Sequence, residues 1–222
     1  MVLGIFGAGG LGREVEIIAN KINKIEHKWS EIIFIDDDSS ITDVYGTTCM
    51  SLADAIKLNS LDLEVVVAVG EPATRQLLFD KLDSLGVKHA TLIHPGVYID
   101  HSTTIGKGSV LCEGVTITTH VTLEDNVYVH PHAIVGHDIH IGKHSMIGAG
   151  AVLGGHNTIG SMVYMGSLSG TKEELTIGDN VIISAGAIVF RDAEPGYILV
   201  GNPARPVRKN EGEGVFHRNT AK

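Results

Sequence analysis

The chain has 222 residues, of which 43% are hydrophobic and 19% charged, enough for one large or two modest globular domains. A formal net charge of −9 argues against a nucleic-acid partner held through its phosphates. Two cysteines give no disulfide framework, and no signal peptide or apolar run of membrane-spanning length is found, so we expect a cytoplasmic protein without membrane insertion.

The first 90 residues alternate short apolar runs with segments of helical periodicity, which is typical of a small parallel α/β sheet. Ser51 and Asp54 form an approximate capping box at the start of the second helix. The expected strands are residues 2–6, 31–35 and 63–69, and the expected helices are residues 13–20, 51–58 and 72–85.

A glycine-rich turn, G-A-G-G-L-G at residues 7–12, joins the first expected strand to the first helix. Glycines let the backbone approach a phosphate, and the helix N-terminus offers N–H groups and a positive dipole end. Asp36 and Asp37 end the second strand, where dinucleotide folds bind a ribose. Because the domain is about half the length of such a fold, a nucleotide-linked substrate is favoured over NAD. The alternative is a turn that serves only close strand–helix packing.

From residue 93 to residue 189 an apolar residue recurs at every sixth position, with one exception. This period fits neither a single helix nor a single strand and indicates a β-helix, a coil of short stacked strands. Small or β-branched residues two positions earlier suit a narrow interior. Three hexads make one triangular turn, so residues three hexads apart stack at about 4.8 Å. The series is Ile93, Ile99, Ile105, Leu111, Ile117, Leu123, Val129, Val135, Ile141, Ile147, Leu153, Ile159, Met165, Thr171, Ile177, Ile183 and Val189.

Thr171 is the exception, and it is followed by Lys172, Glu173 and Glu174. These charged residues interrupt the interior pattern and predict a bulged or extruded turn over residues 170–175. The register resumes unshifted at Ile177. The coil is expected to end near Asp192, with residues 195–208 forming a non-repeating tail.

The three-hexad spacing places histidines and a carboxylate in neighbouring columns. His137 stacks between Thr119 and Gly155, while Asp138 stacks between His120 and His156. A histidine beside a carboxylate is the minimum apparatus for general base catalysis near neutral pH. Gly155 could offer a backbone N–H to a developing oxyanion. The spacing does not determine whether Asp138 contacts the His137 ring.

Together these segments resemble the NeuD/PglD-type sugar acetyltransferases, and the resemblance covers nearly the whole chain. The hexads are shared by many transferases, whereas the two-domain order with a His–acid pair inside a hexad is more specific. The matching motifs are GIFGAGGLGREV at 4–15, FIDDD at 34–38, AVGEPATR at 68–75, GHDIHIG at 136–142, GAGAVLGGHNTIG at 148–160 and VGNPARPVR at 200–208.

The resemblance implies a Rossmann-like nucleotide-sugar-binding domain at residues 1–90 and a left-handed parallel β-helix acyltransferase domain with a tail at 91–210. It implies acetyl transfer from acetyl-CoA to an amino group of a nucleotide-linked deoxyamino sugar in bacterial glycan biosynthesis, by a homotrimer with shared sites and no metal. His137 would be the general base, supported by Asp138. Acetyl-CoA would be bound by Gly155, His156, Arg205 and Arg208, and the sugar nucleotide by Gly7, Gly9, Gly10, Gly12, Asp36, Asp37 and Gly70.

The chain departs from some relatives at two places. These relatives carry one histidine within the glycine-rich turn and another nine residues after the catalytic one. Leu11 and Met146 occupy these positions here, so the resemblance does not determine the contacts to the acceptor.

Three alternatives remain open from the sequence. One is O-acetylation of a sialic-acid-like sugar. The sequence also does not exclude another short acyl donor. The second is a zinc hydratase resembling the γ-class carbonic anhydrases, because His132 and His137 have a suitable five-residue spacing. A zinc hydratase would need a third histidine near position 96, where this chain has Gly96. The glycine-rich N-terminal domain has no role in such an enzyme. The third is a non-catalytic nucleotide-sugar sensor or scaffold.

Overall fold

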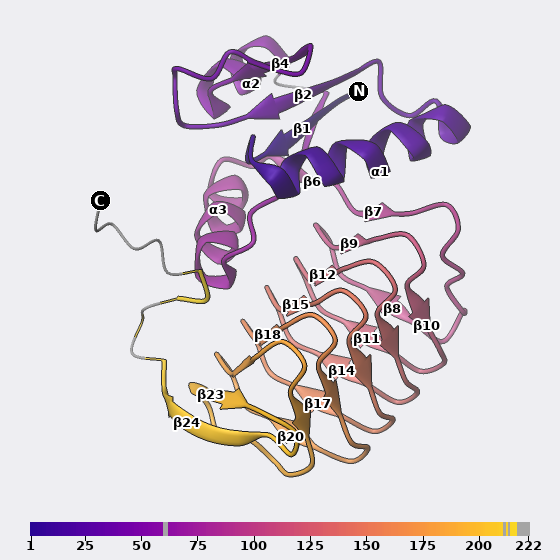
Figure 1. Cartoon of the computed structure of the whole chain (residues 1–222). Coiled ribbons are helices and arrows are strands. Elements are labelled where there is room, and N and C mark those ends of the chain that lie inside the picture. Colours follow the sequence, from indigo (N-terminus) through magenta and orange to yellow (C-terminus); the bar gives the residue numbers. More distant parts are fainter. Residues whose placement is uncertain (60–61, 211, 213, 217–222) are drawn as a thin grey trace.

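The computed structural model describes residues 1–59, 62–210, 212 and 214–216. An α/β domain of Rossmann-like form is followed by a left-handed parallel β-helix, as the sequence predicts (Figure 1). Within the described residues, no helix is both long and apolar enough to cross a membrane.

The N-terminal domain is built on a six-stranded sheet in the order β3-β4-β2-β1-β5-β6. Its central strands are parallel, and β1 lies between β2 and β5 with every residue buried. The expected elements are all present, with bounds that differ by a few residues. The elements are β1 (Val2–Phe6), α1 (Gly10–Glu26), β2 (Glu31–Ile35), β3 (Asp43–Val44), β4 (Thr47–Met50), α2 (Leu52–Asn59), β5 (Leu63–Val67), α3 (Pro72–Ser84) and β6 (Lys88–His89).

Helix α2 begins with the expected capping box. The Ser51 hydroxyl donates to the Asp54 carboxylate at 2.7 Å and accepts from the Asp54 backbone N–H at 3.2 Å. The β3–β4 hairpin was not expected, because its strands are too short to show alternation. Strand β4 nevertheless extends the sheet by pairing with β2, from Phe34–Cys49 to Ile35–Met50.

The β-helix has three faces, each built from parallel two-residue strands, and two longer strands extend one of these faces at its C-terminal end (Figure 1). We name each face by its first strand: the β7 face, the β8 face and the β10 face. The strands of the β7 face are β7 (Leu92–Ile93), β9 (Val110–Leu111), β12 (Tyr128–Val129), β15 (Met146–Ile147), β18 (Tyr164–Met165), β21 (Ile182–Ile183), β23 (Tyr197–Val200) and β24 (Arg205–Lys209). Those of the β8 face are β8 (Thr104–Ile105), β11 (Thr122–Leu123), β14 (His140–Ile141), β17 (Thr158–Ile159) and β20 (Thr176–Ile177). Those of the β10 face are β10 (Thr116–Ile117), β13 (Ile134–Val135), β16 (Val152–Leu153), β19 (Gly170–Thr171) and β22 (Ile188–Val189).

Strand pairing in the coil follows the hexad register. Thr116 pairs with Ile134, which pairs with Val152, each three hexads after the last. The sixth-position residues and the small residues two positions before them fill a continuous interior, for example Val127 and Val129, both 0% exposed. The period of six therefore arises because each short strand points a side chain into the interior.

The prediction of a bulged turn at Thr171 is wrong. Thr171 pairs in register with Leu153 and Val189 and is buried, at 7% exposure. A buried hydroxyl needs a partner, and the Asn157 amide supplies it by donating to Thr171 Oγ1 at 2.6 Å. Asn157 also accepts from the Leu175 backbone N–H at 2.7 Å. A polar pair thus replaces an apolar contact inside the coil without changing its path, and the charged residues that follow lie on an ordinary exposed corner.

The tail after the coil does not repeat in sequence, as expected. It nevertheless forms two strands, β23 and β24. Strand β23 continues the β7 face by pairing in parallel with β21, and β24 returns antiparallel to β23. Ile182 pairs with Ile198, two residues closer than the three-hexad spacing would place it. This shortened return explains why the periodicity does not predict the two strands.

A buried arginine joins the two domains. Arg75 on α3 is fully buried, and its guanidinium donates to the carbonyls of Val67 and Val69 and to the carbonyl and side chain of Asn126 on a coil corner. Burial lowers the pKa of Arg75 to about 10, so it remains charged at neutral pH. The Tyr128 ring, with its centroid 5.5 Å from the guanidinium carbon, covers one side.

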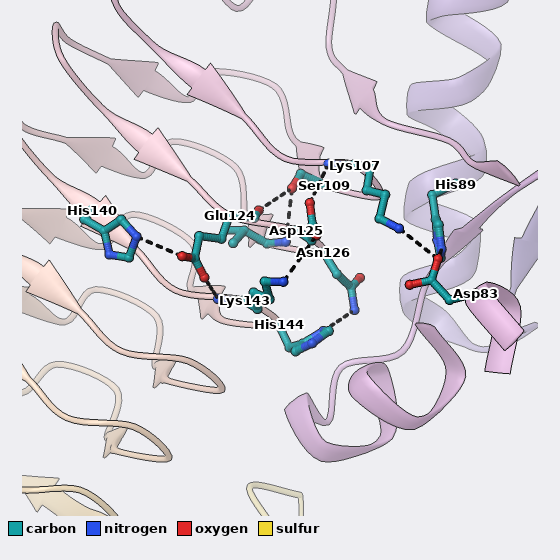
Figure 2. A network of polar contacts seen from close by, with 11 residues as sticks. Asp83, His89, Lys107, Ser109, Glu124, Asp125, Asn126, His140, Lys143 and His144 are labelled. Carbon is teal, nitrogen blue, oxygen red and sulfur yellow. Dashed lines mark hydrogen bonds and ion pairs between the residues drawn. The ribbon is translucent and has the colours of Figure 1, made fainter. Parts of the chain in front are cut away.

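Further polar contacts join the two domains at the same junction. Figure 2 shows Lys107 reaching from the coil to Asp83 on α3, at 2.8 Å, where His89 also contacts that carboxylate. Beside them, the Asn126 amide lies 2.9 Å from His144 Nδ1, one coil turn further on. The N-terminal domain is therefore fixed against the corner between the β8 and β7 faces.

Candidate active site

His137 and Asp138 lie on the corner where the chain passes from the β10 face to the β8 face. Asp138 has a left-handed backbone conformation, with φ of 55°, and the stacked residues His120 and His156 adopt the same conformation. Asp and His tolerate this region better than most residues other than glycine. The repeated corner thus stacks the side chains of three successive turns on the outside of the coil.

The two side chains are in direct contact. His137 Nδ1 lies 2.8 Å from Asp138 Oδ2. The spacing in the sequence does not determine whether Asp138 contacts the His137 ring, and the structure shows that it does. This hydrogen bond is the main reason that the pKa of Asp138 lies below its usual value, so the carboxylate is ionised at neutral pH and can only accept. His137 Nδ1 must therefore carry the proton. In neutral His137 the lone pair lies on Nε2, as a general base requires.

Gly155 lies directly above the His137 ring, as the stacking predicts. A Cβ atom at position 155 would lie 2.6 Å from His137 Cε1 and 2.7 Å from Nε2, too close for any side chain. The absence of a side chain therefore leaves the reactive nitrogen open. The corner also supplies a backbone hydrogen bond, from His156 N–H to the His137 carbonyl at 2.9 Å, which fixes the adjacent turn.

Gly155→Ala is expected to retain the fold and lose activity. The added methyl group must displace the exposed His137 ring and disturb its bond to Asp138. Displacing a catalytic group by about 1 Å can cost about 100-fold, so kcat should fall roughly 10- to 100-fold. Steady-state rates with a thermal melt of the same preparation measure this. A kcat within twofold of wild type, with an unchanged melt, would contradict it.

His156 adds a second imidazole to the corner. Its Nε2 lies 3.8 Å from Asp138 Oδ2, and its ring meets the His137 ring edge-on with centroids 4.9 Å apart. Among the described residues, His137, Asp138 and His156 are the group of three whose ligand atoms could converge on a metal. His132 of the zinc-hydratase alternative is outside this group, because it lies on the preceding corner with its ring against Gly114.

The glycine-rich turn borders a cleft of about 900 Å³ in the N-terminal domain. Gly9 and Gly10 line it: a Cβ atom on Gly9 would meet no described atom within 4 Å, and one on Gly10 would meet the Arg13 guanidinium at 3.9 Å. Helix α1 begins there without an acidic residue in its first turn. Gly7 and Gly12 serve packing instead: a side chain on Gly12 would collide with the Gly7 carbonyl. Gly9 and Gly10 are therefore placed to contact a ligand, whereas Gly7 and Gly12 allow close strand–helix packing. Gly7 also borders the cleft.

The two aspartates of the second strand have different positions. Asp36 lines the cleft and fixes the turn, because its carboxylate accepts from the Ala8 backbone N–H at 2.9 Å. Asp37 is not among the cleft-lining residues, and its carboxylate lies 3.3 Å from Lys81 Nζ. Asp38 and Gly70 line the cleft as well. Asp38 was missed by the sequence reasoning, although it belongs to the same acidic run.

A smaller pocket of about 260 Å³ continues the cleft toward the β-helix. Leu11 and Met146, the two departures from the relatives' pattern, both line it, so these positions meet although 135 residues separate them in sequence. His130 is also there, and burial followed by the charge of Arg75 lowers its pKa to about 4. The pocket is therefore uncharged at neutral pH.

Phe216 borders the cleft and the smaller pocket, and no sequence signal indicated it. It follows the repeats in a segment with neither periodicity nor a recognised motif. Arg205 and Arg208, expected near CoA, lie on β24, whose five residues are all exposed.

Comparison with known proteins agrees with this architecture. Residues 2–82 match the PglD N-terminal domain, and residues 120–155 match the bacterial transferase hexapeptide (six repeats). The chain is similar to the acetyltransferase domain of PglB from Neisseria gonorrhoeae FA1090, solved in complex with acetyl coenzyme A. This match has a TM-score of 0.85 and 32% identity and covers 93% of this chain and 98% of that one.

Two further proteins are similar. WeeI from Acinetobacter baumannii AYE has a TM-score of 0.87 and 29% identity, over 93% of this chain and all of its own. GDP-perosamine N-acetyltransferase of Escherichia coli O157:H7 is 32% identical over 118 residues, 53% of each chain, so the match spans about half of that curated relative. On the near-complete match to the PglB domain, the chain belongs to the NeuD/PglD-type family of sugar acetyltransferases.

Proposed function

We propose that this protein transfers the acetyl group of acetyl-CoA to an amino group of a nucleotide-linked deoxyamino sugar in bacterial glycan biosynthesis. The observation that carries the proposal is the exposed His137–Asp138 pair, with 2.8 Å between Nδ1 and Oδ2 and Nε2 left open beneath Gly155. An amine attacking a thioester must lose a proton, and this pair is built to accept one.

The reaction needs no covalent enzyme intermediate. The acceptor nitrogen attacks the thioester carbonyl and forms the new C–N bond while His137 Nε2 removes its proton. The tetrahedral intermediate then collapses, the C–S bond breaks and CoA leaves as a thiolate, which takes up a proton. Asp138 stabilises the imidazolium, and the backbone amide of Gly155 stabilises the oxyanion.

An amino acceptor is favoured over a hydroxyl by the relatives. The Escherichia coli relative is a GDP-perosamine N-acetyltransferase, and the PglB domain was solved with acetyl coenzyme A. The cleft at the α1 N-terminus suits a nucleoside diphosphate, because Gly9 and Gly10 leave backbone N–H groups accessible. Asp36 and Gly70 would contact the same nucleotide.

We assign the acetyl-CoA site to the coil. His156 lies beside the His137–Asp138 pair, where the thioester must reach, and Arg205 and Arg208 on exposed β24 would bind phosphates of CoA. Both proposed substrates are cytoplasmic metabolites, so we place the enzyme in the cytoplasm, in keeping with two buried free cysteines.

We infer a homotrimer with shared sites, and the positions of the two half-sites support this inference. The smaller pocket reaches the corner between the β7 and β10 faces, through Gly148 and Ala149, whereas His137 lies at the far edge of the β10 face. That face exposes Ile134 at 42% and Val152 at 46%, an apolar surface that a second copy would cover. Threefold packing would bring the His137 corner of one subunit to the cleft of the next.

Mixing two inactive variants tests the shared site. His137→Ala lacks the base, and Gly9→Trp fills the nucleotide cleft of the other subunit. If the site is shared, co-refolded mixtures of equal amounts should recover about a quarter of wild-type activity, because about a quarter of the interfaces pair two intact halves. No recovery, with mixed trimers confirmed by mass spectrometry, would place both halves in one chain.

A screen tests the reaction itself. UDP-, GDP- and dTDP-linked amino sugars, with sialic acid as a hydroxyl acceptor, are incubated with acetyl-CoA while thiol release is followed. We expect turnover with an amino sugar nucleotide. Turnover with sialic acid alone would establish O-acetylation, and acetyl-CoA binding without turnover of any acceptor would favour the scaffold alternative.

A further inference from the structure

Residues 214–216, which follow the coil in sequence, lie against the N-terminal domain. Figure 1 shows the last yellow stretch of the chain beside α3. There the Glu71 carboxylate accepts from the backbone N–H groups of Val215, at 2.7 Å, and Phe216, at 3.2 Å. Two hydrogen bonds to one carboxylate oxygen are of the stronger, charge-assisted kind. The backbone of the segment is thus tied to the residue preceding α3.

This attachment holds the Phe216 ring at the junction of both domains. A Cβ atom added at Gly70 would lie 3.2 Å from Phe216 Cε2, so the ring covers this glycine. The ring also meets the Tyr164 ring of the β7 face edge-on, with centroids 5.4 Å apart. Despite these contacts Phe216 remains 55% exposed. The Phe216 ring is therefore held by its neighbours while part of its surface remains accessible to a ligand.

The available surface faces the route between the two cavities. The cleft at the glycine-rich turn and the smaller pocket share three lining residues, Leu11, Gly70 and Phe216. These three form a neck without a charged side chain. A group linked to a diphosphate at the α1 N-terminus must pass this neck to reach the coil.

We propose that Phe216 is an acceptor-binding residue, whose ring packs against the hexose of the nucleotide-linked sugar, and that residues 214–216 are part of the acceptor site. The inference rests on the proposed function. An aromatic ring suits this place because one face of a pyranose presents C–H groups, while the hydroxyl and amino groups project from its edge. Glu71 is a positioning residue that acts through the segment.

Phe216→Ala provides the first test. The KM for the best nucleotide-linked amino sugar should rise about tenfold, with the KM for acetyl-CoA and the thermal midpoint unchanged. Phe216→Trp should stay within about twofold of wild type, because it retains an aromatic surface. Tyr98→Ala is the matched control: Tyr98 is 77% exposed, on the first turn of the coil, and its removal should change neither KM.

Glu71→Ala provides the second. It should raise the sugar KM in the same way and increase hydrogen exchange at the Val215 and Phe216 amides, which lose their acceptor. The double variant should be no worse than Phe216→Ala alone, because both changes remove the same ring contact. Additive effects would show that Glu71 binds the substrate independently and would overturn its positioning role.

The outcomes separate this inference from the function on which it rests. A sugar KM unchanged in Phe216→Ala would mean that the ring only packs against Tyr164. A rise in the acetyl-CoA KM instead would assign the ring to the donor site, and either result overturns the inference alone. Absence of turnover by the wild-type protein with every UDP-, GDP- and dTDP-linked amino sugar would refute the proposed function as well.

Discussion

His137→Ala is expected to lower kcat for acetyl transfer by about 10²- to 10⁴-fold, the usual contribution of a positioned general base. The KM values should change little, because the side chain is 53% exposed and its one polar contact is to Asp138. The fold should be unaffected, since an exposed corner residue contributes little to the packed interior. Initial rates and the oligomeric state by size-exclusion chromatography measure both expectations.

The chain supplies a matched control. His101 also lies beside an aspartate, with Nδ1 3.1 Å from Asp100 Oδ2, and is exposed on the coil. His101→Ala should therefore retain wild-type kcat. Asp138→Asn is the intermediate case: it keeps the shape but removes the charge that orients His137, and we expect a loss of about 10- to 100-fold. Wild-type turnover by His137→Ala would show that another group accepts the proton.

The β-helix could be predicted because each short strand points an apolar side chain into the interior, which gives the sequence a period of six. The same arithmetic brought Gly155 above His137 and Asp138 between two histidines, since strand pairing preserves the three-hexad register. It failed at Thr171, where a hydrogen bond from Asn157 satisfies a polar group inside the coil. A hydrophobic pattern shows which residues are polar but not which polar side chains are hydrogen-bonded to one another. A hydrogen-bonded polar pair inside the coil is therefore mistaken for an interruption of the repeat.

Contacts between the domains could not be predicted in this way. Leu11 and Met146 meet in one pocket, and Phe216 closes on Gly70, through packing that has no period. Asp36 and Asp37 are adjacent and equally acidic, yet only Asp36 lines the cleft, because neighbouring residues at the end of a strand point in different directions. The catalytic corner is thus local in sequence, whereas the acceptor site depends on how the two domains meet.

Arg75→Met is expected to give the largest loss of stability. The substitution leaves four acceptors of the junction without their donor, including both Asn126 groups and the carbonyls of Val67 and Val69. Leaving a buried hydrogen-bond acceptor unsatisfied costs about 1–3 kcal/mol, so the four together should cost about 4 kcal/mol or more. For a chain of this length the thermal midpoint should fall by roughly 10 °C. Differential scanning calorimetry measures the midpoint, and early loss of the N-terminal domain would appear as a separate transition.

Two further variants identify the cause. Arg75→Lys keeps the charge, but an ammonium on a shorter stem cannot reach acceptors on both domains as the guanidinium does, so it should recover only part of the loss. Lys81→Met removes a cation from the exposed side of the same helix, where it lies 3.3 Å from Asp37, and should change stability by less than about 0.5 kcal/mol. Because the acceptor must pass from the N-terminal cleft to the coil, Arg75→Met should also raise the sugar KM below the melting transition. A destabilised Arg75→Met with an unaltered sugar KM would show that the junction serves stability alone.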